Sequence, residues 1–371
     1  MSESLLKIMI VSRSFYPKNS PRSFRATELA KEFSRIGCSV TVLTPTNPSV
    51  QSYFKNQYQI NIKNLELPLP LLQEKPSEKS SFYLKLIRRI KEQFLYYPEA
   101  LLQKVVFKLL SQEHGYDLLI SVASPHSIHW GVSHALKKNQ NITRCWVADC
   151  GDPFMKAENL QYKRPFYFQF KEKNFCRSAH FITVPFKGAI QGYFPEFQKK
   201  IHVIPQGFNF EDFPRNSVTE IKPYPVFAYA GSLNPKRRNP VRLIEFLLRH
   251  FKDFEFHVYS GNTRLIEPYA ADYPEKIICH GLKDRPDLLR SLSSMNFVIN
   301  FENQGTTQMP SKLIDYAILK KPVLSIHCNE FNEGMIKEFM NGNYSQSLEI
   351  NDIDQYRIEN VAQKFLSLIH L

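Results

Sequence analysis

Short apolar strands alternate with helix-length segments along almost the whole chain, and this alternation constrains the fold more than any other feature. A strand at residues 7–12, a helix at 22–35 and a strand at 39–44 form one βαβ unit. The strand-like runs that follow are residues 117–122, 144–148, 180–184 and 201–204. Such a series predicts a mostly parallel sheet with helices on both faces.

The alternation stops after Gly207 and begins again near residue 226. The stretch between them, residues 209–225, is polar, contains proline and has weak periodicity, as a linker would. The second series has strands at 226–230, 255–260, 276–280, 297–301 and 322–326, and helices at 240–251, 286–294 and 310–319. We therefore predict an α/β protein of two doubly wound, Rossmann-like domains, residues 1–208 and 209–350. A final helix in residues 351–371 could belong to either domain.

The chain is basic, with 48 Lys and Arg against 35 Asp and Glu and a net charge of +13. This excess favours anionic partners, which could be nucleic acid, anionic lipid or phosphorylated substrates. The first apolar run, residues 5–11, is interrupted by Lys7 and is too short for a signal peptide or a membrane span. We therefore expect a cytoplasmic protein.

Neither a metal nor a cofactor is expected. The six cysteines are scattered, with no Cys-x-x-Cys pair and no histidine at zinc-ligand spacing, so reduced thiols are predicted. The Gly-x-Gly-x-x-Gly fingerprint is absent after the first strand, which argues against a nicotinamide or flavin site.

Residues 80–110 depart from the alternation because they are long, basic and aromatic. Apolar side chains recur at near-helical spacing and cations occupy the opposite side; they are Phe82, Tyr83, Leu86, Ile87, Ile90 and Phe94, and Lys85, Arg88, Arg89 and Lys91. Such a helix can lie on an anionic membrane surface. It can equally be an ordinary surface helix whose apolar stripe faces the core.

Two polar clusters follow strand ends in the second predicted domain. Residues 231–238 read Gly-Ser-Leu-Asn-Pro-Lys-Arg-Arg, in which glycine permits close backbone approach and the cations suit a diphosphate. The helix after the loop of Glu302 and Thr307 carries Lys312 and Asp315 one turn apart, and its N-terminus can bind phosphate. The alternatives are a solvated turn and a helix with an exposed ion pair.

Three polar clusters follow strand ends in the first predicted domain. The first strand is followed by four cations that could hold an acidic substrate or an acceptor: Arg13, Lys18, Arg22 and Arg25. His126, Asp149 and Asp152 follow two later strands and could project into one cleft. A histidine there can hydrogen-bond a sugar hydroxyl or share a proton near pH 7. It can also be structural, and Asp152 before proline can be a turn former.

Taken together, these motifs resemble GT-B-fold glycosyltransferases of the family 4 type, the retaining enzymes that build bacterial polysaccharides and glycolipids. The likeness covers most of the chain and lies in residues 7–11, 26–30, 40–44, 146–149, 152–154, 204–209, 229–233, 310–313 and 315–316. The resemblance implies two domains facing across a cleft and a final helix that crosses back to the first domain. It also implies a nucleotide-sugar donor in the C-terminal domain and an acceptor mainly in the N-terminal domain.

The resemblance assigns roles to particular residues. Lys312 and the helix start, with Ser311 and Leu313, would hold the diphosphate, and Arg237 or Arg238 would meet the phosphates beside Gly231 and Ser232. Asp315 would take the place of the glutamate that binds ribose, and His126 would approach the transferring sugar.

The chain also departs from the family pattern at three places. Thr307 stands where the first of two acids eight positions apart is common, although Glu302 lies in the same loop. Cys150 and Gly151 stand where relatives have an aromatic residue and arginine. Residues 19–22 replace a glycine-rich acceptor loop.

The predicted function is transfer of a sugar from a nucleoside diphosphate-sugar to a glycan or lipid-linked acceptor, with retention at the anomeric carbon. Lys312, Arg237 and His126 are the expected catalytic residues, and no nucleic acid is expected as a partner. Two alternatives stay open: a nucleotide-sugar epimerase of the same fold, and a catalytically degenerate protein that binds anions or membranes.

Overall fold

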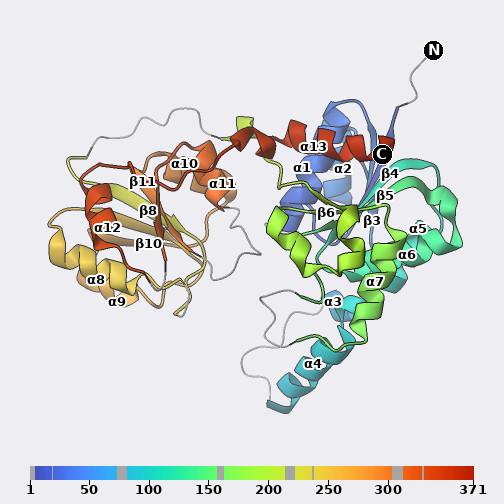
Figure 1. Cartoon of the computed structure of the whole chain (residues 1–371), viewed down its shortest axis with the longest axis horizontal. Helices are drawn as coiled ribbons and strands as arrows, with labels where there is room; N and C mark the ends of the chain where they lie inside the picture. Colours follow the sequence, from blue (N-terminus) through green and yellow to red (C-terminus); the bar gives the residue numbers. More distant parts are fainter. Residues whose placement is uncertain are drawn as a thin grey trace. The chain divides into compact units, whose positions relative to one another are not determined.

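The computed structural model describes residues 5–18, 20–72, 82–156, 163–213, 222–235, 238–302, 312–327 and 330–371, apart from the side chains of Phe82 and Leu84. The chain divides into two compact units (Figure 1), Met1–Phe208 with Gln355–Leu371, and Asn209–Asp354. Each unit contains one parallel sheet with its own helices. The predicted α/β class with two doubly wound sheets is confirmed.

The first unit is built on a seven-stranded parallel sheet in the order β3-β2-β1-β4-β5-β6-β7. Its strands are β1 (Lys7–Ser12), β2 (Ser39–Thr44), β3 (Asn61–Asn64), β4 (Tyr116–Ala123), β5 (Thr143–Cys150), β6 (Phe181–Val184) and β7 (Ile201–Val203). The central strands are buried on both faces, which is why they read as continuous apolar runs. Because all strands run in one direction, their carboxyl ends share one edge, where Arg13, His126 and Asp149 lie.

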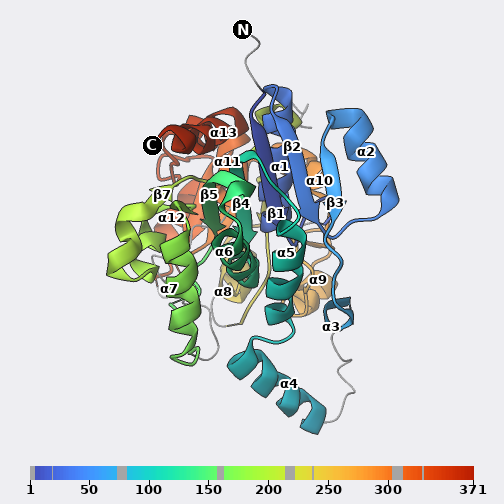
Figure 2. The same ribbon diagram turned by 90° about the vertical axis from the view of Figure 1, so that its right-hand side faces the viewer.

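Helices cover both faces of this sheet (Figure 2). One face packs against α5 (Leu102–Leu110), α6 (Ser127–Lys138) and α7 (Phe168–Ser178), and the other against α1 (Pro21–Arg35), α2 (Pro48–Tyr58) and α13 (Ile358–Ser367). Two further helices, α3 (Leu69–Leu72) and α4 (Phe82–Leu95), precede α5. Ser20 caps α1 by accepting from the Ser23 backbone N–H, and Pro21 opens the helix.

The C-terminal helix belongs to the first unit. Phe208 N–H donates to the Tyr356 carbonyl at 2.8 Å, and Ile358 N–H donates to the Phe208 carbonyl at 3.0 Å. From there α13 buries Val361 and Phe365 in the same core as α1. The chain therefore returns to the first unit after completing the second, as the resemblance implies.

The second unit is a five-stranded parallel sheet in the order β10-β9-β8-β11-β12. Its strands are β8 (Val226–Ala230), β9 (Glu255–Tyr259), β10 (Ile277–His280), β11 (Phe297–Phe301) and β12 (Val323–Ile326). Its helices are α8 (Val241–His250), α9 (Glu267–Asp272), α10 (Arg285–Ser293), α11 (Lys312–Ile318) and α12 (Glu333–Met340). One face packs on α8 and α12, and the other on α10 and α11.

Residues 82–110 contain two α-helices, α4 and α5, that have different environments. In α5, the apolar residues Leu102, Val106 and Leu110 are fully buried. None of the described side chains of α4 is buried. Among the described residues, no helix is long and apolar enough to cross a membrane. The start of the predicted helix 310–319 lies outside the described residues, so α11 is described from Lys312 onward.

Candidate functional site

The first cluster of the second unit lies where β8 ends. Gly231 has φ of +148°, and a Cβ there would lie 2.9 Å from Tyr229 Oη. Tyr229 Oη donates to the Ser232 carbonyl at 3.0 Å, which fixes the turn after the strand. The position therefore requires glycine, and it leaves the backbone after β8 without a side chain in front of it.

Lys312 lies in the first turn of α11, beside this turn. Its Nζ lies 4.2 Å from the centre of the Tyr229 ring. The Nζ atom is shielded from solvent and has no hydrogen-bond partner among the described residues. Burial, with a smaller contribution from Arg238, lowers the pKa of Lys312 to about 7. A buried ammonium without an anion is costly, so this site is suited to an anionic ligand.

Arg238 supplies a second cation. Its Nη1 donates to Ser232 Oγ at 2.9 Å, and backbone hydrogen bonds of 3.1 and 3.0 Å between Asn234 and Arg238 close the turn. Gly231, Ser232, Arg238 and Lys312 are thus brought together at one edge of the sheet. Arg237, Thr307 and Ser311 lie outside the described residues.

Asp315 is not paired with Lys312, so the exposed ion pair considered above is not formed. Instead, Arg285 Nη2 donates to Asp315 Oδ1 at 2.7 Å, and the Arg285 guanidinium lies 5.1 Å from the centre of the Phe213 ring. Burial raises the pKa of Asp315, and Arg285 opposes this effect. The sequence analysis did not predict a role for Arg285. A cation in the first turn of a helix interacts unfavourably with the helix dipole, and this unusual placement is a signal that could have pointed to Arg285.

Glu302 and Leu313 have structural contacts of their own. Glu302 Oε1 accepts from Ser325 Oγ at 2.9 Å, which links the ends of β11 and β12. Leu313 is buried in the core beneath α10 and α11. Their predicted contacts with a donor stay predictions.

In the first unit, two of the predicted residues are engaged by oppositely charged partners. Arg13 Nη1 donates to Glu99 Oε1. Asp149 does not project from the sheet edge as expected, because Arg25 donates to both of its oxygens, at 2.8 and 3.1 Å, and Thr183 Oγ1 donates at 2.8 Å. These contacts hold the pKa of Asp149 below its ordinary value despite burial, which raises it. The geometry therefore makes Asp149 the anchor of Arg25.

Arg25 ties several elements of the first unit together. Besides Asp149, it donates to the carbonyls of Ile204 and Pro205 after β7 and lies 4.9 Å from the centre of the Phe365 ring in α13. The sequence analysis predicted Arg25 as one of four cations that could meet an acidic substrate or an acceptor. The structure instead places its guanidinium on Asp149 and on the backbone after β7.

Arg22 occupies the space in front of Gly151. A Cβ at Gly151 would lie 1.9 Å from Arg22 Nη2, and Arg22 Nη1 lies 3.8 Å from Asp149 Oδ2. The guanidinium from α1 thus lies against the backbone of the loop that carries Asp152. The glycine after β5 is the residue that makes this placement possible.

His126 lies at the N-terminus of α6 and is buried. Its ring lies 5.1 Å from that of Phe154, and its Nε2 has no hydrogen-bond partner among the described residues. Burial, His129 and nearby arginines lower its pKa well below the ordinary value, while a hydrogen bond to the Asp152 backbone acts in the opposite direction. The lowered pKa favours the neutral imidazole, and the predicted role of His126 toward a sugar stays a prediction.

Glu172 is a buried acid that the sequence did not reveal. Its Oε1 accepts from the backbone N–H groups of Phe154 and Met155, at 3.1 and 3.3 Å. Burial raises the pKa of Glu172 to about 7. The side chain therefore holds the loop after β5 next to His126. Among the described residues, no three His, Cys, Asp or Glu side chains are placed to hold a metal ion.

No model of a known protein family matches the chain, and no curated protein matches it. Solved structures do. A glycosyltransferase from Rickettsia africae is 14% identical, with a TM-score of 0.57 over 99% of this chain and 94% of that one. HepE from Anabaena, in complex with UDP-glucose, is 11% identical, with a TM-score of 0.61 over 98% and 99%.

The catalytic domain of starch synthase IV from Arabidopsis thaliana, bound to ADP and acarbose, is 11% identical, with a TM-score of 0.58 over 99% of both chains. Likeness at these identities shows the fold alone. The chain has the GT-B fold along its full length.

Proposed function

We propose that the chain is a glycosyltransferase that moves a sugar from a nucleoside diphosphate-sugar to a hydroxyl of a glycan or a lipid-linked acceptor. We further propose that it retains the anomeric configuration, as in the family 4 type, that the sugar is a hexose, and that it acts in the cytoplasm on bacterial surface polysaccharide or glycolipid. Structures of this fold with bound UDP-glucose and with bound ADP support a nucleoside diphosphate site.

The observation that carries this proposal is the buried Lys312 ammonium. It lies beside a turn that requires glycine, and Arg238 and Ser232 lie on the same side. Two phosphate groups would supply the anion that Lys312 lacks. Asp315, held by Arg285, lies one helical turn further on and keeps a carboxylate oxygen for ribose hydroxyls.

Departure of the diphosphate leaves an oxocarbenium-like sugar and places negative charge on the leaving oxygens. Lys312 and Arg238 would stabilise that charge electrostatically, and no metal is required for this step. Neutral His126, with an unpartnered Nε2, would hydrogen-bond a hydroxyl of the transferring sugar. The leaving phosphate would take the proton of the acceptor hydroxyl.

Thermal melting of the purified chain with UDP, GDP, ADP and dTDP, each with and without sugar, tests the donor site. A ligand at about a hundred times its Kd stabilises the native state by roughly 2.7 kcal/mol. We expect a shift for one base that is lost in Lys312→Met. An absence of shift with every nucleotide would overturn the proposal. Proton NMR of the product then reports the anomeric configuration, and complete isomerisation of donor without acceptor would identify an epimerase instead.

A further inference from the structure

We infer that α4 and the start of α7 form a surface that binds an anionic lipid bilayer. One part of this inference rests on the proposed function: that the bound bilayer carries a lipid-linked acceptor. We call the set Tyr83, Leu86, Ile90, Phe94, Phe166 and Phe170 the α4–α7 surface.

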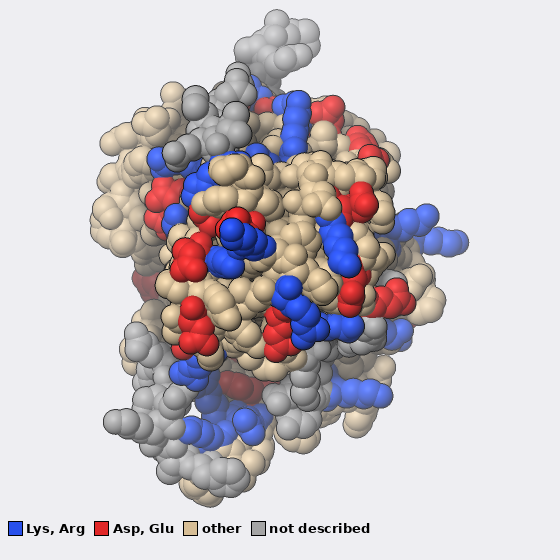
Figure 3. All heavy atoms as spheres, turned by 90° about the vertical axis from the view of Figure 1, so that its left-hand side faces the viewer, with Lys and Arg blue, Asp and Glu red and all other residues tan. Residues whose placement is uncertain are grey.

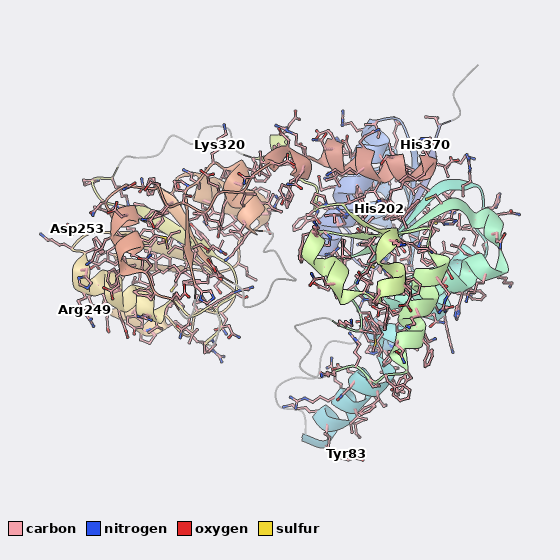
Figure 4. All side chains as sticks on the ribbon, in the orientation of Figure 1. Tyr83, His202, Arg249, Asp253, Lys320 and His370 are labelled. Atoms are coloured by element: carbon pink, nitrogen blue, oxygen red, sulfur yellow. The ribbon has the colours of Figure 1, made fainter. Side chains whose placement is uncertain are left out.

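The apolar stripe of α4 faces outward. Positions 83, 86, 90 and 94 lie along one side of a helix, and their side chains are 69%, 43%, 49% and 46% exposed. Figure 4 shows Tyr83 at the end of α4 that lies away from the sheet. A stripe that packed on the core would be buried like the one on α5, so the structure decides against the core-facing alternative.

The start of α7 extends the same surface. Phe166 and Phe170 are 72% and 64% exposed. Between them, Tyr167 Oη donates to the Phe94 carbonyl at the end of α4, so the two helices are joined where their apolar residues are exposed. Six large apolar side chains exposed on two joined elements mark an interaction site rather than scattered exposure.

The charge of the chain identifies the partner as an anionic surface. Residues 209–354 contain 17 Lys and Arg and 19 Asp and Glu, so the remainder of the chain contains 31 and 16. The whole positive excess therefore belongs to the first unit. The face of the second unit that Figure 3 shows has Lys and Arg interspersed with Asp and Glu.

Within α4 itself, four cations accompany a single acid, Glu92, which pairs with Arg88 at 2.6 Å. These cations are Lys85, Arg88, Arg89 and Lys91. An exposed apolar stripe with basic residues on its other side is the pattern of a helix that lies in the plane of an anionic bilayer.

The α4–α7 surface is linked to the site at His126. Just after α4, Tyr96 packs its ring 5.2 Å from that of Phe154, and Phe154 lies 5.1 Å from His126. Arg164 lies 4.0 Å from the centre of the Phe154 ring and 4.9 Å from that of Tyr96. A bilayer bound by α4 and α7 would therefore hold a lipid-linked acceptor next to the first-unit site.

Sedimentation of the full chain with vesicles tests this inference. The vesicles are phosphatidylcholine alone, or with about one third phosphatidylglycerol. The apolar variant combines Leu86→Ser, Ile90→Ser and Phe170→Ser, and its control combines Leu282→Ser and Tyr273→Ser, two exposed apolar residues of the second unit. The charge variant combines Lys85→Gln, Arg89→Gln and Lys91→Gln, and its control is Arg249→Gln, Lys252→Gln and Arg264→Gln.

We expect the wild type and both controls to bind the anionic vesicles and not phosphatidylcholine alone. The apolar variant should bind at least tenfold more weakly, and the charge variant roughly 100-fold more weakly, at about fivefold per charge. An apolar variant that binds like the wild type overturns the inference, as does a wild type that binds no anionic vesicle. A dimer that becomes monomeric in the apolar variant, with vesicle binding unchanged, would assign the surface to a second copy of the chain.

Nucleotide-induced melting separates this inference from the proposed function. Whichever of UDP-glucose and ADP-glucose raises the melting temperature of the wild type should raise that of both variants by the same amount, which also shows that the variants are folded. If a variant loses vesicle binding but keeps the nucleotide-induced melting shift, the substitutions have affected the α4–α7 surface and not the donor site. If the wild type binds vesicles but shows no nucleotide-induced melting shift, the proposed function is contradicted and the membrane-binding inference is not.

Discussion

The environment of Lys312 predicts that donor binding takes up a proton. With a pKa of about 7 in the free protein, only about a tenth of Lys312 is charged at pH 8. A bound diphosphate next to Nζ favours the charged form and raises this pKa, so binding at pH 8 should take up roughly 0.9 of a proton. A nucleoside diphosphate-sugar has no phosphate proton that titrates near pH 8, so the uptake reports the protein.

Isothermal titration with UDP-glucose and ADP-glucose, in two buffers of different ionisation enthalpy, measures this uptake. The observed heat should differ between the buffers at pH 8 and differ little at pH 6, where roughly nine tenths of Lys312 is already charged. Affinity should fall about tenfold per pH unit above pH 7. Lys312→Met should abolish both effects. Equal heats in the two buffers at pH 8, with binding intact, would refute the assignment of Lys312 to the diphosphate.

The lowered pKa of Lys312 also affects the free energy of unfolding of the second unit, and the direction of this effect can be measured. The folded pKa of about 7 lies below the unfolded value of about 10.4, so the charged form is penalised in the fold. The penalty is complete below pH 7 and disappears above the unfolded pKa. At pH 8 it amounts to roughly 3 kcal/mol, which Lys312→Met should recover in the second unit. Calorimetry is the suitable measurement, because both tryptophans, Trp130 and Trp146, lie in the first unit.

Three further predictions concern the first unit. Tryptophan fluorescence reports the unfolding of this unit. Arg25→Met removes the two hydrogen bonds of the Arg25 guanidinium to the buried Asp149 carboxylate, which keeps its contacts with the Thr183 hydroxyl and, at 3.8 Å, the Arg22 guanidinium. It should destabilise the unit by about 3 kcal/mol in urea; a loss below about 1 kcal/mol would contradict the anchoring role. Gly151→Ala should displace the Arg22 guanidinium and reduce transfer to the level of Arg22→Ala with little change in melting, whereas Gly281→Ala, where no atom lies within 4 Å, should be neutral. Burial raises the folded pKa of Glu172 from its ordinary value of 4.5 to about 7, so its penalty grows as pH rises from about 4 to 7 and is constant above that. Glu172→Gln should therefore stabilise the unit by roughly 3 kcal/mol at pH 8 and by little at pH 4; an equal effect at both pH values would contradict this reasoning.

The sequence was sufficient for the sheets because buried parallel strands leave a strong signal. The predicted strands 7–12 and 297–301 contain the apolar runs 8–11 and 297–299, and β1 and β11 have the predicted bounds. β3 was missed because its sequence, Asn-Ile-Lys-Asn, buries only Ile62 and has no apolar run. The segment 80–110 was ambiguous because periodicity defines an apolar stripe but not what covers it.

The sequence could predict where the candidate site residues lie in the fold, but not which side chains they contact. The sequence predicted that polar residues near the strand ends lie at one edge of each sheet, because parallel strands place their carboxyl ends together. The sequence gives no means to see that Asp149 turns inward to Arg25, which is 124 positions away, or that Arg285 pairs with Asp315, 30 positions away. Such pairings depend on tertiary distances, and no local pattern encodes them.

Lys312 differs from three other cations of the chain, and this difference indicates where a ligand is needed. Buried Arg25 and half-buried Arg13 in the first unit, and Arg285 in the second, each face a carboxylate, so those charges are compensated within the fold. Lys312 in the second unit faces an aromatic ring and has no hydrogen-bond partner among the described residues. Because an uncompensated buried cation costs stability, its retention beside a glycine-only turn is best explained by an anion that arrives with the substrate. The diphosphate that we propose as part of the donor would supply this anion.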